Sequence, residues 1–227
     1  MTWKADRGTL FRLCVLVAAA AAAPAALAQA APGAGSRGAE IAPFAGLFWT
    51  TQVQTTSGYL STDPALDLGG TISFPVGPTS HAQILYAYAK ATSRHVSQLP
   101  LEPSTNDFDL VSQYFQVGGS TSFSSGTLEP FISGTLGATW FSAENVQLAD
   151  GTPVSYGDRW LFSFTLGGGL KLFLSRALGL RLEARAMFPV FFSSGAYYSG
   201  PGGSALVVSG GIPVVQGDVS LGLVIAP

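Results

Sequence analysis

Apolar and polar residues alternate with a period of two along most of the chain beyond Glu40. The clearest case is residues 160–174, where every second residue is apolar or glycine and most of those between are small or polar. Such an alternation indicates a β-strand with two unlike faces. In residues 180–192 the apolar side chains oppose Arg181, Glu183 and Arg185, so every charge falls on one face. The pattern predicts two amphipathic strands here.

Six further segments repeat this alternation less strictly. Each is long enough to cross a bilayer as a tilted strand, which takes about 9–11 residues. No segment beyond Glu40 reaches the roughly 18 consecutive apolar residues of a membrane helix. The pattern therefore predicts eight strands, at residues 41–51, 66–76, 82–94, 109–123, 132–140, 160–174, 180–192 and 215–225.

The connections between these strands alternate strictly in length. Short joins are predicted at 77–80, 124–128 and 175–178, and long joins at 52–63, 95–107, 144–158 and 193–211. Up-and-down membrane barrels have short turns on the periplasmic side and long loops outside the cell. The sequence thus predicts an all-β protein, an eight-stranded antiparallel up-and-down transmembrane β-barrel. A soluble lipocalin-like barrel with an apolar interior is the alternative.

The first 28 residues have the arrangement of a secretory signal peptide. Basic residues precede an apolar stretch at 14–23, and Ala26 and Ala28 form an A-x-A pattern, so we expect cleavage after Ala28. Pro24 interrupts the apolar run, which disfavours an N-terminal membrane helix. We expect residues 29–39, rich in Ala, Gly and Pro, to be a flexible segment and residues 40–227 to form the barrel domain.

Composition narrows the class of protein. Charged residues make up 11% of the chain, against about 25% in soluble domains. Apolar residues make up 47% and the net charge is −2, which excludes a disordered chain. No basic stripe is present to neutralise phosphates, so nucleic acid is not an expected partner. Beyond Cys14 there is no cysteine, and packing or a membrane has to stabilise the exported part.

Large aromatic residues fall where the predicted strands meet the long loops. An aromatic girdle is expected at a membrane interface because amphipathic rings prefer that level. The alternative is that these rings fill a core. The predicted girdle consists of Trp49, Trp140, Trp160 and Phe192, with Phe108 and Phe191 at the same level; Phe44, Phe74, Phe123 and Phe173 are expected nearer the other rim, with Phe44 and Phe173 facing inward.

Four stretches carry a family resemblance: residues 40–46 (EIAPFAG), 128–139 (LEPFISGTLGAT), 164–185 and 216–223 (QGDVSLGL). With them the chain resembles the OmpA- and OmpX-like eight-stranded barrels of Gram-negative bacteria. The resemblance implies a monomer in the outer membrane, surrounded by outer-membrane lipid and lipopolysaccharide and inserted by the outer-membrane machinery. The aromatic residue that usually ends such barrels is absent here. The resemblance implies no particular activity.

The polar face of the strands suggests a charged lumen. Charges sealed in a narrow barrel are costly unless they are paired. Three acids and three bases on this face predict an internal salt-bridge network that plugs the lumen, and an ion- or solute-conducting lumen is the alternative. Gly167, Gly168 and Gly169 are expected to make room for close packing. The predicted network consists of Asp67, Lys171, Arg181, Glu183, Arg185 and Asp218.

Other candidate chemistry is sparse. Some barrels that the chain resembles are lipid A acyl hydrolases or transferases, which place His, Ser and a carboxylate at the outer rim. That resemblance makes His95, near Ser93 and Ser97, the candidate for such chemistry, and His81 lies at the opposite end of the same strand. No motif supports that reading, so we expect no catalytic residue, no cofactor and no metal. The long joins remain as possible binding surfaces; they contain Asp150, Tyr156, Asp158, Tyr197 and Tyr198. The sequence therefore predicts a plugged barrel with a structural or surface-interaction role.

Overall fold

A computed structural model describes most of the chain beyond residue 37. It covers residues 38–51, 53–55, 58–97, 105–124, 126–144, 158–190, 196–199, 205–207 and 214–226. The expected cleavage site at Ala26 and Ala28, the aromatic residues Phe191 and Phe192, and most of the predicted long joins lie outside these ranges.

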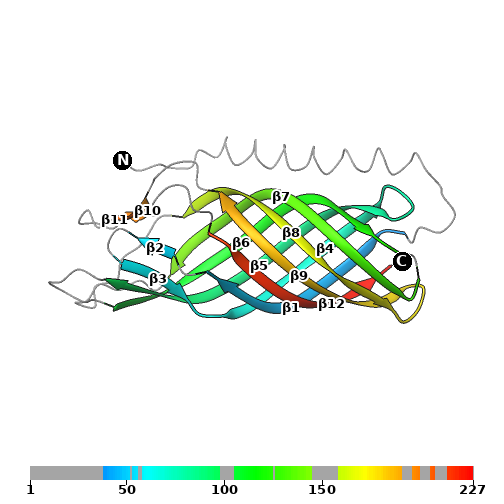
Figure 1. The fold of residues 1–227 in the computed structure, drawn as a ribbon, viewed down its shortest axis with the longest axis horizontal. Coiled ribbons are helices and arrows are strands. Elements are labelled where there is room, and N and C mark those ends of the chain that lie inside the picture. The colour runs from blue at the N-terminus through cyan, green and yellow to red at the C-terminus, as the bar shows by residue number, and fades with distance from the viewer. Residues whose placement is uncertain are drawn as a thin grey trace.

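Eight long strands form one closed antiparallel barrel (Figure 1). Each strand pairs with its neighbours along the chain, and the first strand pairs with the last, Phe44 opposite Gly222, which closes the ring. This confirms the predicted up-and-down transmembrane barrel. The barrel strands are β1 (Glu40–Thr50), β4 (Ala65–Pro75), β5 (Ser80–Ser97), β6 (Thr105–Ser122), β7 (Leu128–Glu144), β8 (Arg159–Phe173), β9 (Leu178–Val190) and β12 (Gln216–Ile225).

The predicted joins and strand lengths need correction at one end of the barrel. The join at 52–63 contains β2 (Val53–Thr55) and β3 (Gly58–Thr62), and β3 pairs with the far end of β5. The join at 193–211 contains β10 (Ala196–Ser199) and β11 (Ala205–Val207), which pair with each other. β5 and β6 have 18 residues each, against 11 in β1 and β4. Alternation alone missed these extensions because their residues carry little apolar contrast.

The short joins are tight hairpins gathered at the end of the barrel where the chain terminates (Figure 1). In the first, the Val76 amide donates to the Ser80 carbonyl at 3.0 Å; in the last, the Leu174 amide donates to the Leu178 carbonyl at 2.9 Å. β2, β3, β10 and β11 lie at the opposite end. We call the two ends the short-turn end and the loop end.

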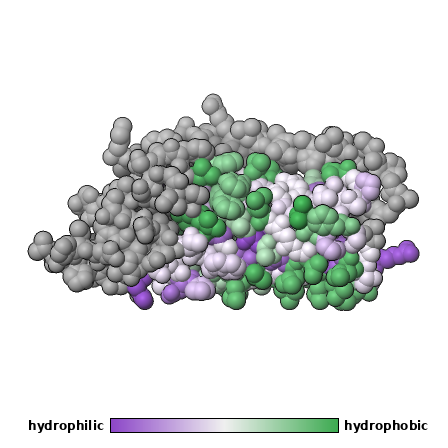
Figure 2. Space-filling model, viewed as in Figure 1, coloured by the Kyte–Doolittle hydropathy of each residue, from purple (hydrophilic) through white to green (hydrophobic). Residues whose placement is uncertain are grey.

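The outer wall of the barrel is apolar and the inner wall is largely polar. Along β9, Leu178, Leu180 and Leu182 are exposed while Arg181, Glu183 and Arg185 are buried. Figure 2 shows apolar residues gathered over the described wall on the face in view. An apolar outer band is the surface that lipid requires, and closure lets every strand pair on both sides. Among the described residues, no helix has the length and apolarity needed to cross a membrane.

Aromatic rings from β5, β6, β7 and β8 lie close to one another on the outer wall. Ring centroids are 5.1 Å apart for Tyr86 and Phe115, 5.9 Å for Phe115 and Trp160, and 6.4 Å for Trp140 and Trp160. Trp49 and Trp160 are exposed on the wall toward the loop end. Phe108 was expected among them, but it is buried and faces inward, because it shares the strand face of Leu110 and Tyr114.

A charge placed at the middle of this wall tests its contact with lipid. Leu221 is exposed near the middle of β12, and Leu174 is exposed just beyond β8 at the short-turn rim. We expect Leu221→Arg to lower the free energy of unfolding in lipid bilayers by about 2–4 kcal/mol, and Leu174→Arg by about 0–1 kcal/mol. Urea titration in bilayers measures both. Equal costs at the two depths would contradict a wall that spans the membrane.

Candidate functional site

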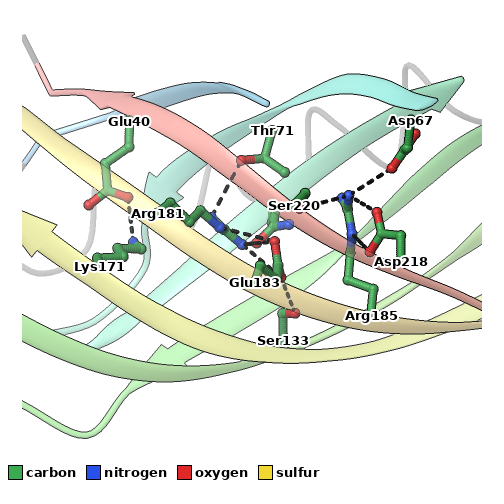
Figure 3. Close-up of polar contacts among 11 residues, drawn as sticks. Glu40, Asp67, Thr71, Ser133, Lys171, Arg181, Glu183, Arg185, Asp218 and Ser220 are labelled. Atoms are coloured by element: carbon green, nitrogen blue, oxygen red, sulfur yellow. Dashed lines mark hydrogen bonds and ion pairs between the residues drawn. The ribbon is translucent and has the colours of Figure 1, made fainter. Parts of the chain in front are cut away.

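The barrel lumen gathers nearly all of the buried charge in the described ranges. Its charged residues lie on the inward faces of six of the eight barrel strands, and every one is buried. Figure 3 shows most of them pointing toward one another from different strands. The buried charged residues are Glu40, Asp67, Glu129, Lys171, Arg181, Glu183, Arg185 and Asp218, with His81 beside them.

Arg185 holds two carboxylates that come from different strands. Its Nε donates to Asp218 Oδ1 at 2.9 Å and its Nη2 donates to Asp67 Oδ2 at 3.2 Å and to Ser220 Oγ at 3.2 Å. A further hydrogen bond joins Nη2 to Asp218 Oδ2. The guanidinium also lies 4.0 Å from the centre of the Phe44 ring. A planar guanidinium suits this position because it binds carboxylates and stacks on an aromatic face at the same time.

Arg181 forms a second cluster one step nearer the short-turn end. Its Nε and Nη2 donate to the two oxygens of Glu183 at 3.1 and 3.0 Å, and Ser133 Oγ donates to Glu183 at 2.9 Å. Longer contacts of 3.4 and 3.5 Å reach Thr71 and Gln83 on the opposite wall. The Arg181 guanidinium stacks over the ring of Phe131, 4.4 Å from its centre.

Lys171 crosses the lumen to Glu40, the first residue of β1. The Lys171 ammonium donates to Glu40 Oε2, and both side chains are buried. His81 Nε2 lies 3.9 Å from the other Glu40 oxygen. Ala42, Phe173 and Val224 form a small apolar cluster at this short-turn end. The link therefore ties β1 to β8, which are not neighbours in the barrel.

Toward the loop end the lumen contents become uncharged and then apolar. Tyr114 donates to Gln216 across the lumen, and Gln116 accepts from Thr135 and donates to Ser163, at 2.7 and 2.8 Å. Buried apolar side chains lie at this level or beyond it toward the loop end. They include Phe48 of β1, Leu110 of β6, Phe141 of β7, Met187 of β9, and Val214, which precedes β12.

Gly167 makes the space that the charged clusters occupy. A Cβ at this position would lie 2.5 Å from Ser133 Oγ, 3.0 Å from Glu183 Oε1 and 3.1 Å from Arg185 Cγ. The neighbouring Gly134 faces outward, where a Cβ would meet only Leu166 Cδ2 at 3.9 Å. The expected role of glycine in close packing thus applies at Gly167 inside the lumen.

The six charged residues named from the sequence all face inward, but the pairing could only be seen in the structure. Arg185 meets Asp67 and Asp218, and Arg181 meets Glu183, whereas Lys171 bonds to none of the six. Its partner Glu40 was overlooked, as was the buried Glu129, so the predicted balance of three acids and three bases is wrong. The alternation does place both residues on the inward face. Glu40 lies an even number of residues from the inward Phe44, and Glu129 lies an even number of residues from Ser133 and Thr135.

The residues that an acyl hydrolase or transferase would use do not form a cluster in the described part of the chain. His81 and His95 lie at opposite ends of β5, and the side chains of His95 and Ser97 are outside the described part. Ser93 is buried and shares a hydrogen bond of 3.0 Å with Thr62. Asp150, Tyr156, Tyr197 and Tyr198 are likewise without a described side chain. Within the described ranges, no group of three potential metal ligands occurs.

One ion-pair cluster stands on the outer wall. Lys90 donates to Glu144 at 2.9 Å and lies 3.3 Å from Asp109, which joins β5, β6 and β7. All three side chains are partly exposed to the surroundings, unlike those of the lumen. An exposed pair of this kind contributes little to stability, because water screens it.

Comparison with solved structures places this architecture among outer-membrane barrels. Neisserial surface protein A matches with a TM-score of 0.50 and 13% identity, over 83% of this chain and 96% of its own. OprG of Pseudomonas aeruginosa has a TM-score of 0.48 and 14% identity, covering 84% of this chain and 97% of its own, and Ail of Yersinia pestis has 0.47 and 15%, covering 83% and 98%. The first comparison supports the fold: the chain is an eight-stranded outer-membrane-type barrel.

Two other comparisons give no relative. No family model matches the chain, and no curated protein matches it.

Removal of Arg185 tests whether the lumen charges are held by pairing. Arg185→Met leaves two buried carboxylates without their cation, and we expect it to lower the free energy of unfolding by about 3–5 kcal/mol. The triple variant Arg185→Met, Asp67→Asn, Asp218→Asn removes all three charges and is expected to recover most of that loss. Urea unfolding in bilayers measures both variants, and an equal loss in the two would contradict pairing.

A second prediction concerns the space at Gly167. Gly167→Ala should lower the free energy of unfolding by about 1–3 kcal/mol, because the new methyl overpacks the charged clusters. Gly134→Ala, one ladder position away on the outer face, is the matched control and should be nearly neutral. The same unfolding assay compares them. A Gly134→Ala cost as large as that of Gly167→Ala would show that the lumen is not the cause.

Proposed function

We propose that the protein is a small outer-membrane barrel with a closed lumen, which acts as a structural or surface-interaction protein through its loops. The observation that carries the proposal is that polar links span the lumen at successive levels. They run from β8 to β1 through Lys171, from β9 to β4 through Arg185, and from β6 to β12 through Tyr114. None of these strand pairs is adjacent in the ring.

Closure has an energetic as well as a steric basis. An eight-stranded barrel has an interior just wide enough for side chains to fill. Opening a path would separate buried ions from their partners, and removal of a partner from a buried pair costs several kcal/mol. The apolar residues toward the loop end add a layer that water would have to wet. A conducting lumen would require rearrangement at several levels together.

A closed lumen leaves the loop end as the surface available for interaction. Its long joins contain Tyr197 and Tyr198, together with several acidic residues. Loops on a rigid scaffold are a common place for binding. In this proposal the wall faces outer-membrane lipid and lipopolysaccharide, the outer-membrane machinery inserts the chain, and the barrel works as a monomer.

Single-channel recording in planar bilayers tests the closed lumen. The wild-type protein should show no sustained open events. The variant Arg181→Ser, Arg185→Ser removes both guanidinium groups from the lumen and is expected to show small openings, provided that heat-modifiable gel mobility confirms its fold. Sustained wild-type conductance would replace the proposal by its alternative, a narrow ion or solute channel.

The proposed interaction through the loops is tested by a separate experiment. Replacement of residues 145–157 and 200–204 by short Gly-Ser linkers should leave heat-modifiable mobility and the closed lumen intact. It should weaken binding of the purified protein to immobilised lipopolysaccharide. Undiminished binding would contradict a role for these loops in that contact. A change in lipid A mass that depends on His95 would instead favour the enzyme alternative.

A further inference from the structure

His81 is a buried residue of the lumen without a hydrogen-bond partner. It is the second residue of β5, at the short-turn end, and only 7% of its surface is exposed. Neither ring nitrogen has a partner, and the same is true of the buried hydroxyl of Ser73. Ser73 lies directly opposite Glu40 in the ladder between β1 and β4. Orphaned polar atoms are rare in folded interiors and point to a use or to bound water.

Charged side chains of both signs, from four other strands, lie at the His81 end of the lumen. β1 contributes Glu40, whose Oε1 lies 3.9 Å from His81 Nε2 and whose Oε2 is bonded to Lys171 of β8. β9 contributes Arg181, which is bound to Glu183. β7 contributes the inward Glu129, which faces Lys171 across the ladder. The inward residues of β4 and β6 at this level are serines, without a titratable group.

A proton on His81 would change this balance. Neutral imidazole has one donor and one acceptor, whereas imidazolium has two donors and a full charge. Lys171 is bonded to one oxygen of the Glu40 carboxylate, and the other oxygen lies 3.9 Å from His81 Nε2, so the new cation has to share Glu40 with Lys171 or draw it away. A buried charge without a partner is costly. The cost falls if imidazolium takes Glu40 from Lys171, or if water enters to solvate both cations.

We propose that His81 is a proton-binding site whose occupation breaks the Glu40–Lys171 link and admits water to the short-turn end of the lumen. The proposal goes beyond the closed barrel and does not depend on the loop role. In the topology of outer-membrane barrels the short-turn end faces the periplasm. The ligand is therefore a proton from that side. The clusters of Arg181 and Arg185 lie farther in and stay paired, so the end opens without forming a pore.

Cysteine accessibility in the folded protein tests the proposal. Ser73→Cys, in a Cys14→Ser background, places a small thiol beside His81, and Ser175→Cys places one on an exposed turn as the reference. Both thiols are labelled with a small water-soluble methanethiosulfonate in bilayers whose two faces are both accessible to the reagent. Because a buried and an exposed thiol differ in pKa, each rate is first divided by the thiolate fraction from that thiol's own pH titration, and the two corrected rates are then compared as a ratio. This ratio should rise as the pH falls from 8 to 5, by about tenfold for each pH unit in that interval that lies above the pKa of His81.

The variant His81→Gln should remove the rise while leaving the ratio at pH 8 unchanged. His95→Gln, which alters the other histidine of the chain, should keep it. A ratio that stays flat in the wild type, or that rises equally in His81→Gln, would overturn the proposal. If His81→Gln fails the heat-modifiability check, His81→Asn takes its place. Wild-type conductance at pH 8 would overturn the closed lumen, but it would not change the outcome of the labelling experiment. Failure of the proposed function and failure of the proton-binding site can therefore be told apart.

Discussion

Closure of β1 on β12 is the constraint on which the rest of this structure depends. A strand in hydrocarbon has no water to satisfy its amide and carbonyl groups, so every one must pair within the protein. The pairing of Phe44 with Gly222 and its neighbours removes the last free edge. Once the ring is closed, each strand has one face toward lipid and one toward the lumen. The two faces then meet opposite chemical demands with the same alternating sequence.

The lumen resolves a second demand, which closure itself creates. Side chains on the inner wall are cut off from bulk water, and yet the described strands place eight charged residues there. Each arginine meets the cost in the same way, with a carboxylate at its edge and an aromatic ring at its face. Gly167 supplies the room that two such clusters need side by side. The interior is thus held by specific polar geometry, whereas the lipid face needs only to be apolar.

His81 differs from this arrangement. Lys171, Arg181 and Arg185 are each bonded to a carboxylate, while His81 has no hydrogen-bond partner and lies next to a link between two strands that are not neighbours. A neutral histidine leaves the link between Glu40 and Lys171 intact, whereas a charged one would compete with Lys171 for Glu40. That contrast makes the short-turn end the part of the lumen most open to control by pH, and it separates this end from the apolar layer near the loops.

The sequence by itself determined the class of fold and the face on which each residue lies, because a strand alternates with a period of two and lipid leaves a strong apolar signal. Eight strands, the order of short and long joins, and the inward position of Arg181, Glu183 and Arg185 followed from that local rule. The partners of those charges did not follow. Lys171 meets Glu40 across 131 positions of sequence, and Arg185 meets Asp67 across 118. Such contacts depend on strand tilt and on the register between strands, which arise only when the barrel closes. The extensions of β5 and β6 were decided at the same level, since pairing with a neighbour carried those strands past the end of their apolar pattern. The inward position of Phe108 instead follows the local alternation that it shares with Leu110 and Tyr114.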